Sequence, residues 1–353
     1  MKKVFILGLL MMGLVSCADK GPVAPKEGRQ SVGEILSEPV QSTETVKADK
    51  PQSVTTWAFI NKNATNRKPQ ATIRQFPKFV RSVSIGKGIN EDNQTLGGPV
   101  VLSGIIYTLD SRFTLQATEL KTGKILWRQS LANITGTTAK SIGLAIYHQK
   151  LYAVAGNGLI VALNLSGKQI WKRELNIPLR SNPILDSNRL FVSSIHNQLF
   201  VLNADNGQEL WHYTGERSIT NFFGMGEPAV RGNITVMPTT DGRVNAFDTT
   251  TGMTLWSQDM WTKKTYNPIL DIPHVTAAPV IDTDTVYLVG NAGKTGAFHL
   301  TTGMPIFTTG IGGRETPAIG GNALYIVTNQ KELVALDKKE GRLFWKTTLN
   351  ASD

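Results

Sequence analysis

The stretch Ala-Phe-Asp-Thr-Thr-Thr-Gly-Met-Thr-Leu-Trp, at Ala246–Trp256, is one of six stretches built to the same pattern. In each copy a small apolar residue is followed by a short turn, a glycine, and an aromatic residue four positions after that glycine. The six copies are Ala117–Trp127, Ala162–Trp171, Val201–Trp211, Ala246–Trp256, Ala297–Phe307 and Ala335–Trp345. Eighteen residues before each copy lies the start of another shared element, at Pro99, Leu144, Pro183, Pro228, Pro279 and Pro317. A spacing kept six times predicts a repeat architecture.

Each repeat is predicted to hold four short strands. In the last repeat these are Thr316–Ile319, Ala323–Thr328, Glu332–Leu336 and Arg342–Thr347, separated by breaks rich in glycine and asparagine. Short β-forming segments bounded by such residues are typical of antiparallel strands joined by hairpins.

The turn in each repeat has a chemical explanation. Asn164, Asn203, Asp248 and Asp337 are residues that bond to their own backbone and start a turn. The glycine supplies a positive φ without steric cost, and the aromatic residue is expected to fill the wedge between one repeat and its neighbour. The residues assigned these structural roles are Gly123, Trp127, Gly167, Trp171, Gly207, Trp211, Gly252, Trp256, Gly303, Phe307, Gly341 and Trp345.

The period of the repeat favours a β-propeller. From aromatic to aromatic it runs from 38 to 51 residues, which suits one four-stranded blade per repeat. Radial packing of such blades leaves only short, protected edges. A β-sandwich with coincidental spacing would not explain six identical offsets of eighteen residues.

The N-terminus has the features of a bacterial export signal. Lys2 and Lys3 precede a twelve-residue apolar segment from Val4 to Val15, which is too short to span a bilayer as a helix. Residues 1–16 are therefore predicted to be a lipoprotein signal peptide, and Cys17, the only cysteine, the lipidated residue. The alternative is a spare cysteine beside an ordinary cleavage site. Ala18 stands where an aspartate would favour inner-membrane retention, so we expect the periplasmic face of the outer membrane.

Residues 17–78 are predicted to be a proline-rich tether behind the lipidated cysteine. Six prolines and many Ser, Thr, Lys and Glu residues make this part unsuited to a core of its own. Within it, the apolar Trp57–Phe59 is expected to dock on the propeller. Residues 79–353 are predicted to form the propeller as one domain.

The sequence offers little support for chemistry or for nucleic-acid binding. The net charge is +10, but no basic run is interleaved with aromatic residues. The five histidines do not have the spacing of metal ligands, and no nucleophile elbow, metalloprotease motif or P-loop is present. We therefore predict no catalytic residues, no metal and no cofactor.

The repeat resembles that of pyrroloquinoline quinone (PQQ)-dependent dehydrogenases, whose repeat motif Ala246–Trp256 matches almost residue for residue. Those enzymes carry a disulfide between adjacent cysteines, which a chain with Cys17 as its single cysteine cannot form. We also find no group of Asp, Glu and Asn residues that would serve as their calcium site. The resemblance therefore implies the scaffold and not the chemistry.

Together, the signal, the tether and the PQQ-like repeats resemble the BamB family of outer membrane protein assembly lipoproteins, in its alphaproteobacterial form. The stretches that carry this resemblance are Ser84–Gly88, Leu96–Val101, Gly226–Val230, Ile272–Asp282, Thr328–Asn329 and Leu333–Asp337. The resemblance implies a non-catalytic scaffold in the β-barrel assembly machinery. Its implied partners are a BamA-type barrel protein, other subunits of the machinery, unfolded outer-membrane protein clients and, through the lipid, the membrane. Two other functions stay open: a PQQ-binding protein like the dehydrogenases, and an envelope adaptor unrelated to barrel assembly.

The resemblance also points to candidate contact residues in two loops, before the fourth and the fifth repeat. The family's charged contact residues are not present there. The candidates are Phe222, Phe223, Gly226, Glu227, Ile272, His274 and Thr276. Phe222 and Phe223 are suited to an apolar contact with a partner, although a place in the blade core explains them equally well.

The number of blades is a departure from the family pattern. The resemblance implies eight blades, with an N-terminal strand completing the last, and Phe79–Ile85 is the candidate for that strand. Only six repeats are present, and the sixth has its own fourth strand. Our hypothesis is a family member without two C-terminal blades; the alternative is a ring that closes with fewer blades.

Overall fold

The structure is a computed structural model that describes residues 39–59, 63–72, 78–88, 97–131, 141–216, 226–260 and 274–349. The chain divides into two compact units, Met1–Ile35 and Leu36–Asp353, and all the described residues belong to the second. The signal peptide, Cys17, Phe222, Phe223 and Ile272 lie outside the described residues.

The described residues hold 24 strands in six four-stranded antiparallel sheets, which we number 1 to 6 in chain order. Sheet 1 contains β1 Val100–Leu102, β2 Ile105–Leu109, β3 Thr114–Glu119 and β4 Ile125–Ser130. Sheet 2 contains β5 Ser141–Tyr147, β6 Lys150–Ala155, β7 Leu159–Asn164 and β8 Gln169–Glu174. Sheet 3 contains β9 Ile184–Asp186, β10 Arg189–Ser193, β11 Gln198–Asn203 and β12 Glu209–Thr214. Sheet 4 contains β13 Ala229–Arg231, β14 Ile234–Pro238, β15 Arg243–Asp248 and β16 Thr254–Asp259. Sheet 5 contains β17 Val280–Asp282, β18 Thr285–Gly290, β19 Lys294–His299 and β20 Pro305–Thr309. Sheet 6 contains β21 Ala318–Gly320, β22 Ala323–Val327, β23 Glu332–Asp337 and β24 Leu343–Thr348.

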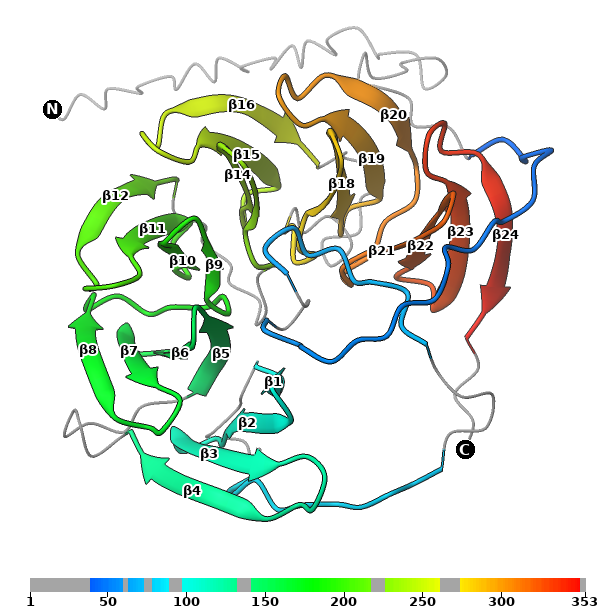
Figure 1. The fold of residues 1–353 in the computed structure, drawn as a ribbon. Coiled ribbons are helices and arrows are strands. Elements are labelled where there is room, and N and C mark those ends of the chain that lie inside the picture. Colours follow the sequence, from blue (N-terminus) through cyan, green and yellow to red (C-terminus); the bar gives the residue numbers. More distant parts are fainter. Residues whose placement is uncertain are drawn as a thin grey trace, which may run out of the picture. The chain divides into compact units, whose positions relative to one another are not determined.

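Each sheet is one propeller blade, with its strands hydrogen-bonded in sequence order. Strands β1, β5, β9 and β21 lie toward the middle of Figure 1, and the fourth strand of each sheet lies on the outside. The predicted all-β propeller of four-stranded PQQ-like blades is confirmed.

The repeated turn has the predicted chemistry. In sheet 4 the Asp248 carboxylate accepts hydrogen bonds from the backbone N–H groups of Thr250 and Thr251, at 3.0 and 2.8 Å. Gly252 then adopts a φ of 76° and donates its N–H to the Asp248 carbonyl at 2.8 Å. A bulge after Ala246 places Trp256 directly opposite that alanine. The position of the aromatic residue is thus fixed by the turn and the bulge together.

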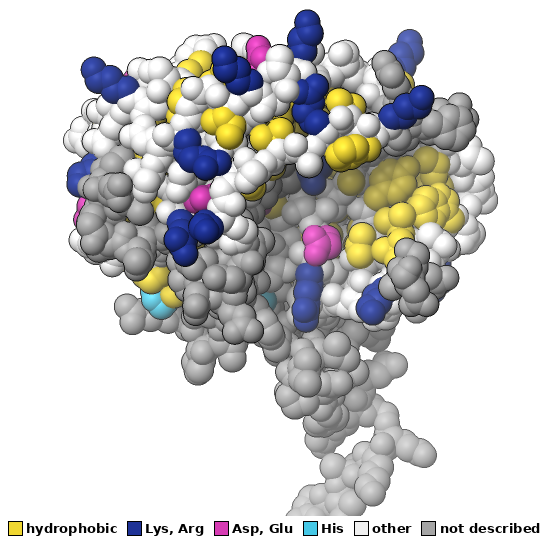
Figure 2. Space-filling model, turned by 90° about the horizontal axis from the view of Figure 1, so that it is seen from below, with side chains coloured by type: hydrophobic (Ala, Val, Ile, Leu, Met, Phe, Trp, Pro, Cys, Tyr) yellow, Lys and Arg dark blue, Asp and Glu magenta, His cyan; other side chains and the backbone are white. Residues whose placement is uncertain are grey.

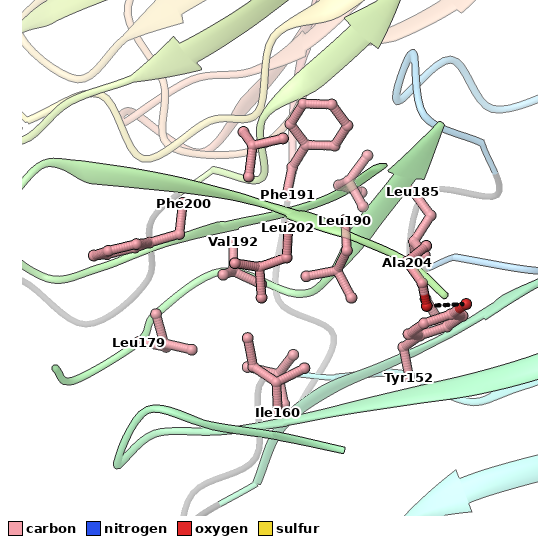
Figure 3. Close-up of a cluster of buried hydrophobic side chains, with 14 of the residues drawn as sticks. Tyr152, Ile160, Leu179, Leu185, Leu190, Phe191, Val192, Phe200, Leu202 and Ala204 are labelled. Carbon is pink, nitrogen blue, oxygen red and sulfur yellow. Dashed lines mark hydrogen bonds between the residues drawn. The ribbon is translucent and has the colours of Figure 1, made fainter. Parts of the chain in front are cut away.

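The core lies between the faces of successive sheets. Its largest cluster joins sheets 2, 3 and 4, and Figure 3 shows part of it. There Ile160 of sheet 2 lies below Val192 and Leu202 of sheet 3, and all three are fully buried. The hydroxyl of Tyr152 crosses the interface to donate to the Ala204 carbonyl at 3.1 Å. Apolar burial of this kind supplies most of the stability of a packed domain.

The aromatic residue of each repeat packs against the glycine of the next repeat. A Cβ added to Gly167, Gly207, Gly252, Gly303 or Gly341 would lie within 2.4–3.2 Å of the aromatic ring atoms of the preceding sheet. The rings are those of Trp127, Trp171, Trp211, Trp256 and Phe307. Glycine is therefore needed here both for its positive φ and for close contact with the ring. At these five interfaces the aromatic residue therefore lies in the wedge between one sheet and the next.

The N-terminal part is more closely tied to the sheets than a tether would be. Trp57–Phe59 and Asn63–Arg67, which we call the strap, run along the inner strands. The Trp57 N–H and carbonyl pair with Val101, and the carbonyls of Ala58, Ala64 and Thr65 accept from three further inner-strand residues. Those donors are Ile146, Val230 and Ile281, at 2.7–3.0 Å, so the strap binds sheets 1, 2, 4 and 5. The expected docking of Trp57–Phe59 is confirmed, and the strap crosses the middle of Figure 1 in blue.

Other N-terminal residues bind sheets 6 and 1. Val40 and Ser42 exchange backbone hydrogen bonds with Leu343 at the start of β24. The segment Phe79–Ile85, expected to complete the last blade, contacts sheet 1 instead: the Ser84 carbonyl accepts from the Gln116 side chain at 3.1 Å. The boundary at residue 79 between tether and propeller stays a prediction.

Candidate functional site

Residues that precede the inner strands join sheet 3 to sheet 4 and sheet 5 to sheet 6. Asn182, before β9, donates its side-chain N–H to the Glu227 carboxylate, before β13, at 2.7 Å. The Ala278 N–H, before β17, donates to the Thr316 hydroxyl, before β21, at 3.1 Å. These positions are equivalent in the repeat, so polar side chains here form joints between neighbouring blades near the propeller axis.

Glu227 is the carboxylate at the centre of this region. It is 9% exposed, and its burial raises the pKa of the carboxyl, an effect that the Asn182 hydrogen bond partly opposes. The shift follows from the cost of keeping a carboxylate ionised away from water. Because its folded-state pKa lies above the unfolded value, Glu227 makes the protein less stable as pH rises.

Substitution of Glu227 by Gln is therefore expected to flatten the dependence of stability on pH. Gln keeps an acceptor for Asn182 but does not ionise. The Glu227 contribution, present only in the wild type, lowers the free energy of unfolding as pH rises from the unfolded-state to the folded-state pKa of this carboxyl. The slope is up to about 1.4 kcal/mol per pH unit. Urea unfolding of both proteins at several pH values from acid to neutral measures this. An unfolding free energy for Glu227→Gln that falls with pH in parallel with the wild type would contradict it.

The strap is held against this region by Asn66. Its side chain is 1% exposed and donates to the carbonyls of Glu227, Pro228 and Pro279, at 3.4, 3.3 and 3.1 Å. Its φ of 56° lies in the left-handed region, which Asn tolerates better than most residues. One side chain thus ties the strap to sheets 4 and 5.

A charged cluster secures the next residue of the strap. The Arg67 guanidinium lies 3.1 Å from the Asp282 carboxylate, which is also 2.9 Å from the Lys338 ammonium. Asp282 is at the end of β17 and largely buried, and Lys338 belongs to the turn of sheet 6. The cluster links the strap with sheets 5 and 6.

The candidate contact residues that the structure describes lie within joints between blades. Gly226 is buried, and a Cβ there would come within 2.5 Å of the Ala277 carbonyl. His274 is 1% exposed, and the half-buried Thr276 donates its hydroxyl to the Arg314 carbonyl at 3.1 Å. These residues and Glu227 therefore have a structural role, and their contact with a partner stays a prediction. Phe222, Phe223 and Ile272 lie outside the described residues.

Sequence reasoning did not identify Asn66, Arg67 or Asp282 as a group. The only signal was the Trp57–Phe59 island, which marked a docking segment a few residues before them. The partners of Asn66 are backbone carbonyls, and these leave no trace in the sequence of the sheets.

Among the described residues, no group of His, Cys, Asp and Glu side chains is placed to hold a metal ion. Nor do those residues include a helix with the length and hydropathy to cross a membrane.

Comparison with known proteins connects this fold with one family. The family model for the outer membrane protein assembly factor BamB matches residues 111–347. An uncharacterized protein of Rickettsia conorii is 25% identical over 353 residues, covering 99% of this chain and 79% of the relative. The outer membrane protein assembly factor BamB of Shewanella oneidensis is 25% identical over 289 residues, covering 79% of this chain and 72% of the relative.

Among solved structures, BamB from Moraxella catarrhalis matches with a TM-score of 0.64 at 18% identity. The match covers 75% of this chain and 79% of that one, and it supports the propeller fold. Because the family model covers six repeats with their connecting loops, apart from the start of the first, the chain belongs to the family of outer membrane protein assembly factor BamB.

Proposed function

We propose that the chain is a non-catalytic scaffold lipoprotein of the β-barrel assembly machinery. In this proposal it binds a BamA-type barrel protein and assists the insertion of outer-membrane β-barrel proteins. The observation that carries the proposal is the family match over residues 111–347, across which the blades are joined by buried contacts. Family membership makes a role in outer membrane protein assembly the first expectation, and the binding of BamA is the finer step proposed here.

The inner edges of the sheets support a scaffold rather than an enzyme. The strap uses backbone hydrogen bonds to cover part of four inner strands, where an open propeller axis would offer room to a small ligand. Of the two ionisable candidates, Glu227 is bonded to Asn182 of the neighbouring blade, and His274 is buried.

Lipidation of Cys17 would place the propeller at the periplasmic face of the outer membrane. Twenty-one residues, Ala18–Glu38, separate this cysteine from the described part of the chain. Fully extended, such a segment reaches at most about 75 Å. Stable anchoring needs more than one acyl chain, which a bacterial lipoprotein cysteine supplies.

The test is to express the full chain in a related Gram-negative host, solubilise the outer membrane gently and identify the copurifying proteins by mass spectrometry. We expect recovery of a BamA-type barrel protein in near-stoichiometric amount. Cys17→Ser is expected to move the protein from the membrane to the soluble periplasmic fraction. Recovery of other envelope proteins without the barrel would instead support an unrelated adaptor, and tight binding of PQQ with calcium would support a quinone-binding protein.

A further inference from the structure

Arg180 is a buried cation to which no described residue supplies a counter-charge. It lies in the connection between sheets 2 and 3 and is 6% exposed. No ion pair between described residues includes it, and its Nη1 atom has no hydrogen-bond partner there. The Lys and Arg side chains that Figure 2 shows stand out from the surface instead. Because a buried charge is normally paired, Arg180 points to an anion from outside the chain.

The charge of this guanidinium is fixed. Burial lowers the pKa of Arg180, because removal from water disfavours the charged form. A guanidinium nevertheless stays protonated in proteins and keeps five N–H donors. Glu227 does not neutralise it: its carboxylate is bonded to Asn182, and its own burial raises its pKa, which favours the neutral acid.

The side chain of Arg180 points into the interface between sheets 3 and 4. The preceding residue, Leu179, forms a β-bridge with Ser194 and packs near Val192 on the side of sheet 3 that faces sheet 2 (Figure 3). Arg180 continues this antiparallel pairing and donates its N–H to the Ser193 carbonyl at 2.9 Å. Successive side chains of an extended chain point to opposite faces, so Arg180 and Ser193 both point toward sheet 4.

The register of sheet 3 supports this direction. Ser193 lies opposite Leu199, and Leu199 lies opposite Tyr213, so these three side chains share one face of the sheet. The Tyr213 ring packs on Phe247 of sheet 4, with the ring centroids 4.7 Å apart. The row therefore faces sheet 4, and Arg180 stands at its inner end, beside Ser193.

The Ser193 hydroxyl is a second donor beside the guanidinium. The side chain is fully buried, and within the described part of the chain its hydroxyl has no hydrogen-bond partner. Its backbone is already used, since the N–H donates to the Ser181 hydroxyl at 2.8 Å and the carbonyl accepts from Arg180. Residues that face each other on antiparallel strands have Cβ atoms about 5 Å apart, so one small ligand can contact both side chains.

We propose that Arg180 and Ser193 bind a small inorganic oxyanion, of the phosphate or sulfate class, between sheets 3 and 4. The planar guanidinium donates two parallel hydrogen bonds to two oxygens of such an ion, and the hydroxyl donates to a third. The low exposure of Arg180 keeps a protein surface or a lipid headgroup from reaching the charge, which favours a free ion. The net charge of +10, seen as many Lys and Arg side chains in Figure 2, attracts anions to the molecule.

Equilibrium dialysis of the soluble Cys17→Ser protein against radiolabelled inorganic phosphate tests the proposal. At constant ionic strength we expect one saturable phosphate per chain, displaced by sulfate but not by chloride. Arg180→Met is expected to weaken binding about a hundredfold or more, and Ser193→Ala, which loses one hydrogen bond to a charged group, about tenfold. Arg173→Met is the matched control, because Arg173 is exposed on the outer strand of sheet 2 and should leave phosphate binding unchanged.

Phosphate is also expected to stabilise the parent protein and not the Arg180→Met variant. A ligand that binds only the folded state raises the unfolding temperature, so phosphate should raise the Tm of the parent above its value in chloride at the same ionic strength. The Tm of Arg180→Met should be the same in both salts. Without phosphate, Arg180→Met should be at least as stable as the parent, because methionine removes an unpaired buried charge.

Four results would overturn the proposal. The first two are a parent protein without saturable phosphate binding, and equal binding by the parent and Arg180→Met. The third is an Arg180→Met protein that is less stable than the parent by the same amount with and without phosphate, which would show that the guanidinium serves the fold alone. The fourth is competition by sn-glycerol 3-phosphate as strong as that by sulfate, which would show a site open to organic phosphates such as lipid headgroups.

Discussion

Trp256→Ala is expected to lower the free energy of unfolding by about 3–5 kcal/mol, the usual cost of removing a buried tryptophan side chain. Trp256 is 8% exposed, packs on Gly303 and donates its indole N–H to the Leu300 carbonyl at 2.8 Å. The substitution leaves a cavity between sheets 4 and 5 that the stiff strands cannot close, and it removes the hydrogen bond that spans the interface. Equilibrium unfolding in urea, followed by circular dichroism, measures the loss.

Trp345→Ala is the control, because Trp345 occupies the same position in the repeat and is 38% exposed. Its cost is expected to be about 1 kcal/mol or less, as for substitutions outside the core. The contrast separates the effect of the interface from the effect of losing an indole on the fourth strand. Equal losses for the two variants would show that the contact with the next sheet contributes little.

The sequence predicted the blades well because their structure is encoded locally. The strand predicted at Glu332–Leu336 is observed at Glu332–Asp337, and the one predicted at Arg342–Thr347 is observed at Leu343–Thr348. The first strand of this repeat, predicted at Thr316–Ile319, is observed at Ala318–Gly320. Turn residues and glycine with positive φ fix the hairpins, and the aromatic spacing follows from them.

The strap and the candidate site were less predictable for a physical reason. Composition indicated a tether, yet Ala58, Ala64 and Thr65 bind the inner strands through backbone carbonyls, to which any residue except proline can donate from its own N–H. Glu227 was a candidate contact because it lies in a loop next to the fourth repeat. Its burial depends on Asn182 in the neighbouring blade, 45 residues away in sequence.

The second large effect is expected for Asn66→Ala. The variant loses the buried donor to three carbonyls, which costs about 1–3 kcal/mol when acceptors are left unsatisfied. It also places alanine at a φ of 56°, which costs a further 1–2 kcal/mol or so. The expected total is a loss of about 2–5 kcal/mol in the free energy of unfolding.

Asn176→Ala separates these two contributions. Asn176 has a φ of 54° but is exposed, so its substitution is expected to show the backbone cost alone. Asn66→Asp is the complementary change. It keeps the size of the side chain but replaces the amide N–H, which donates to three carbonyl oxygens, with a carboxylate oxygen that cannot donate. Near neutral pH it should destabilise the protein at least as much as Asn66→Ala does.

Hydrogen exchange shows whether the loss is local to the strap. The amides of Val230 and Ile281 donate to the strap carbonyls of Ala64 and Thr65, at 2.7 and 3.0 Å. In Asn66→Ala both should exchange faster, while the amide of Val192, which lies within sheet 3 away from the strap, should be slowed as in the wild type. Faster exchange at all three would mean that Asn66 stabilises the whole domain cooperatively, and no change at Val230 and Ile281 would mean that the strap is held without it. The first two amides belong to sheets 4 and 5, so their joint response measures how far the Asn66 side chain couples these two blades through the strap.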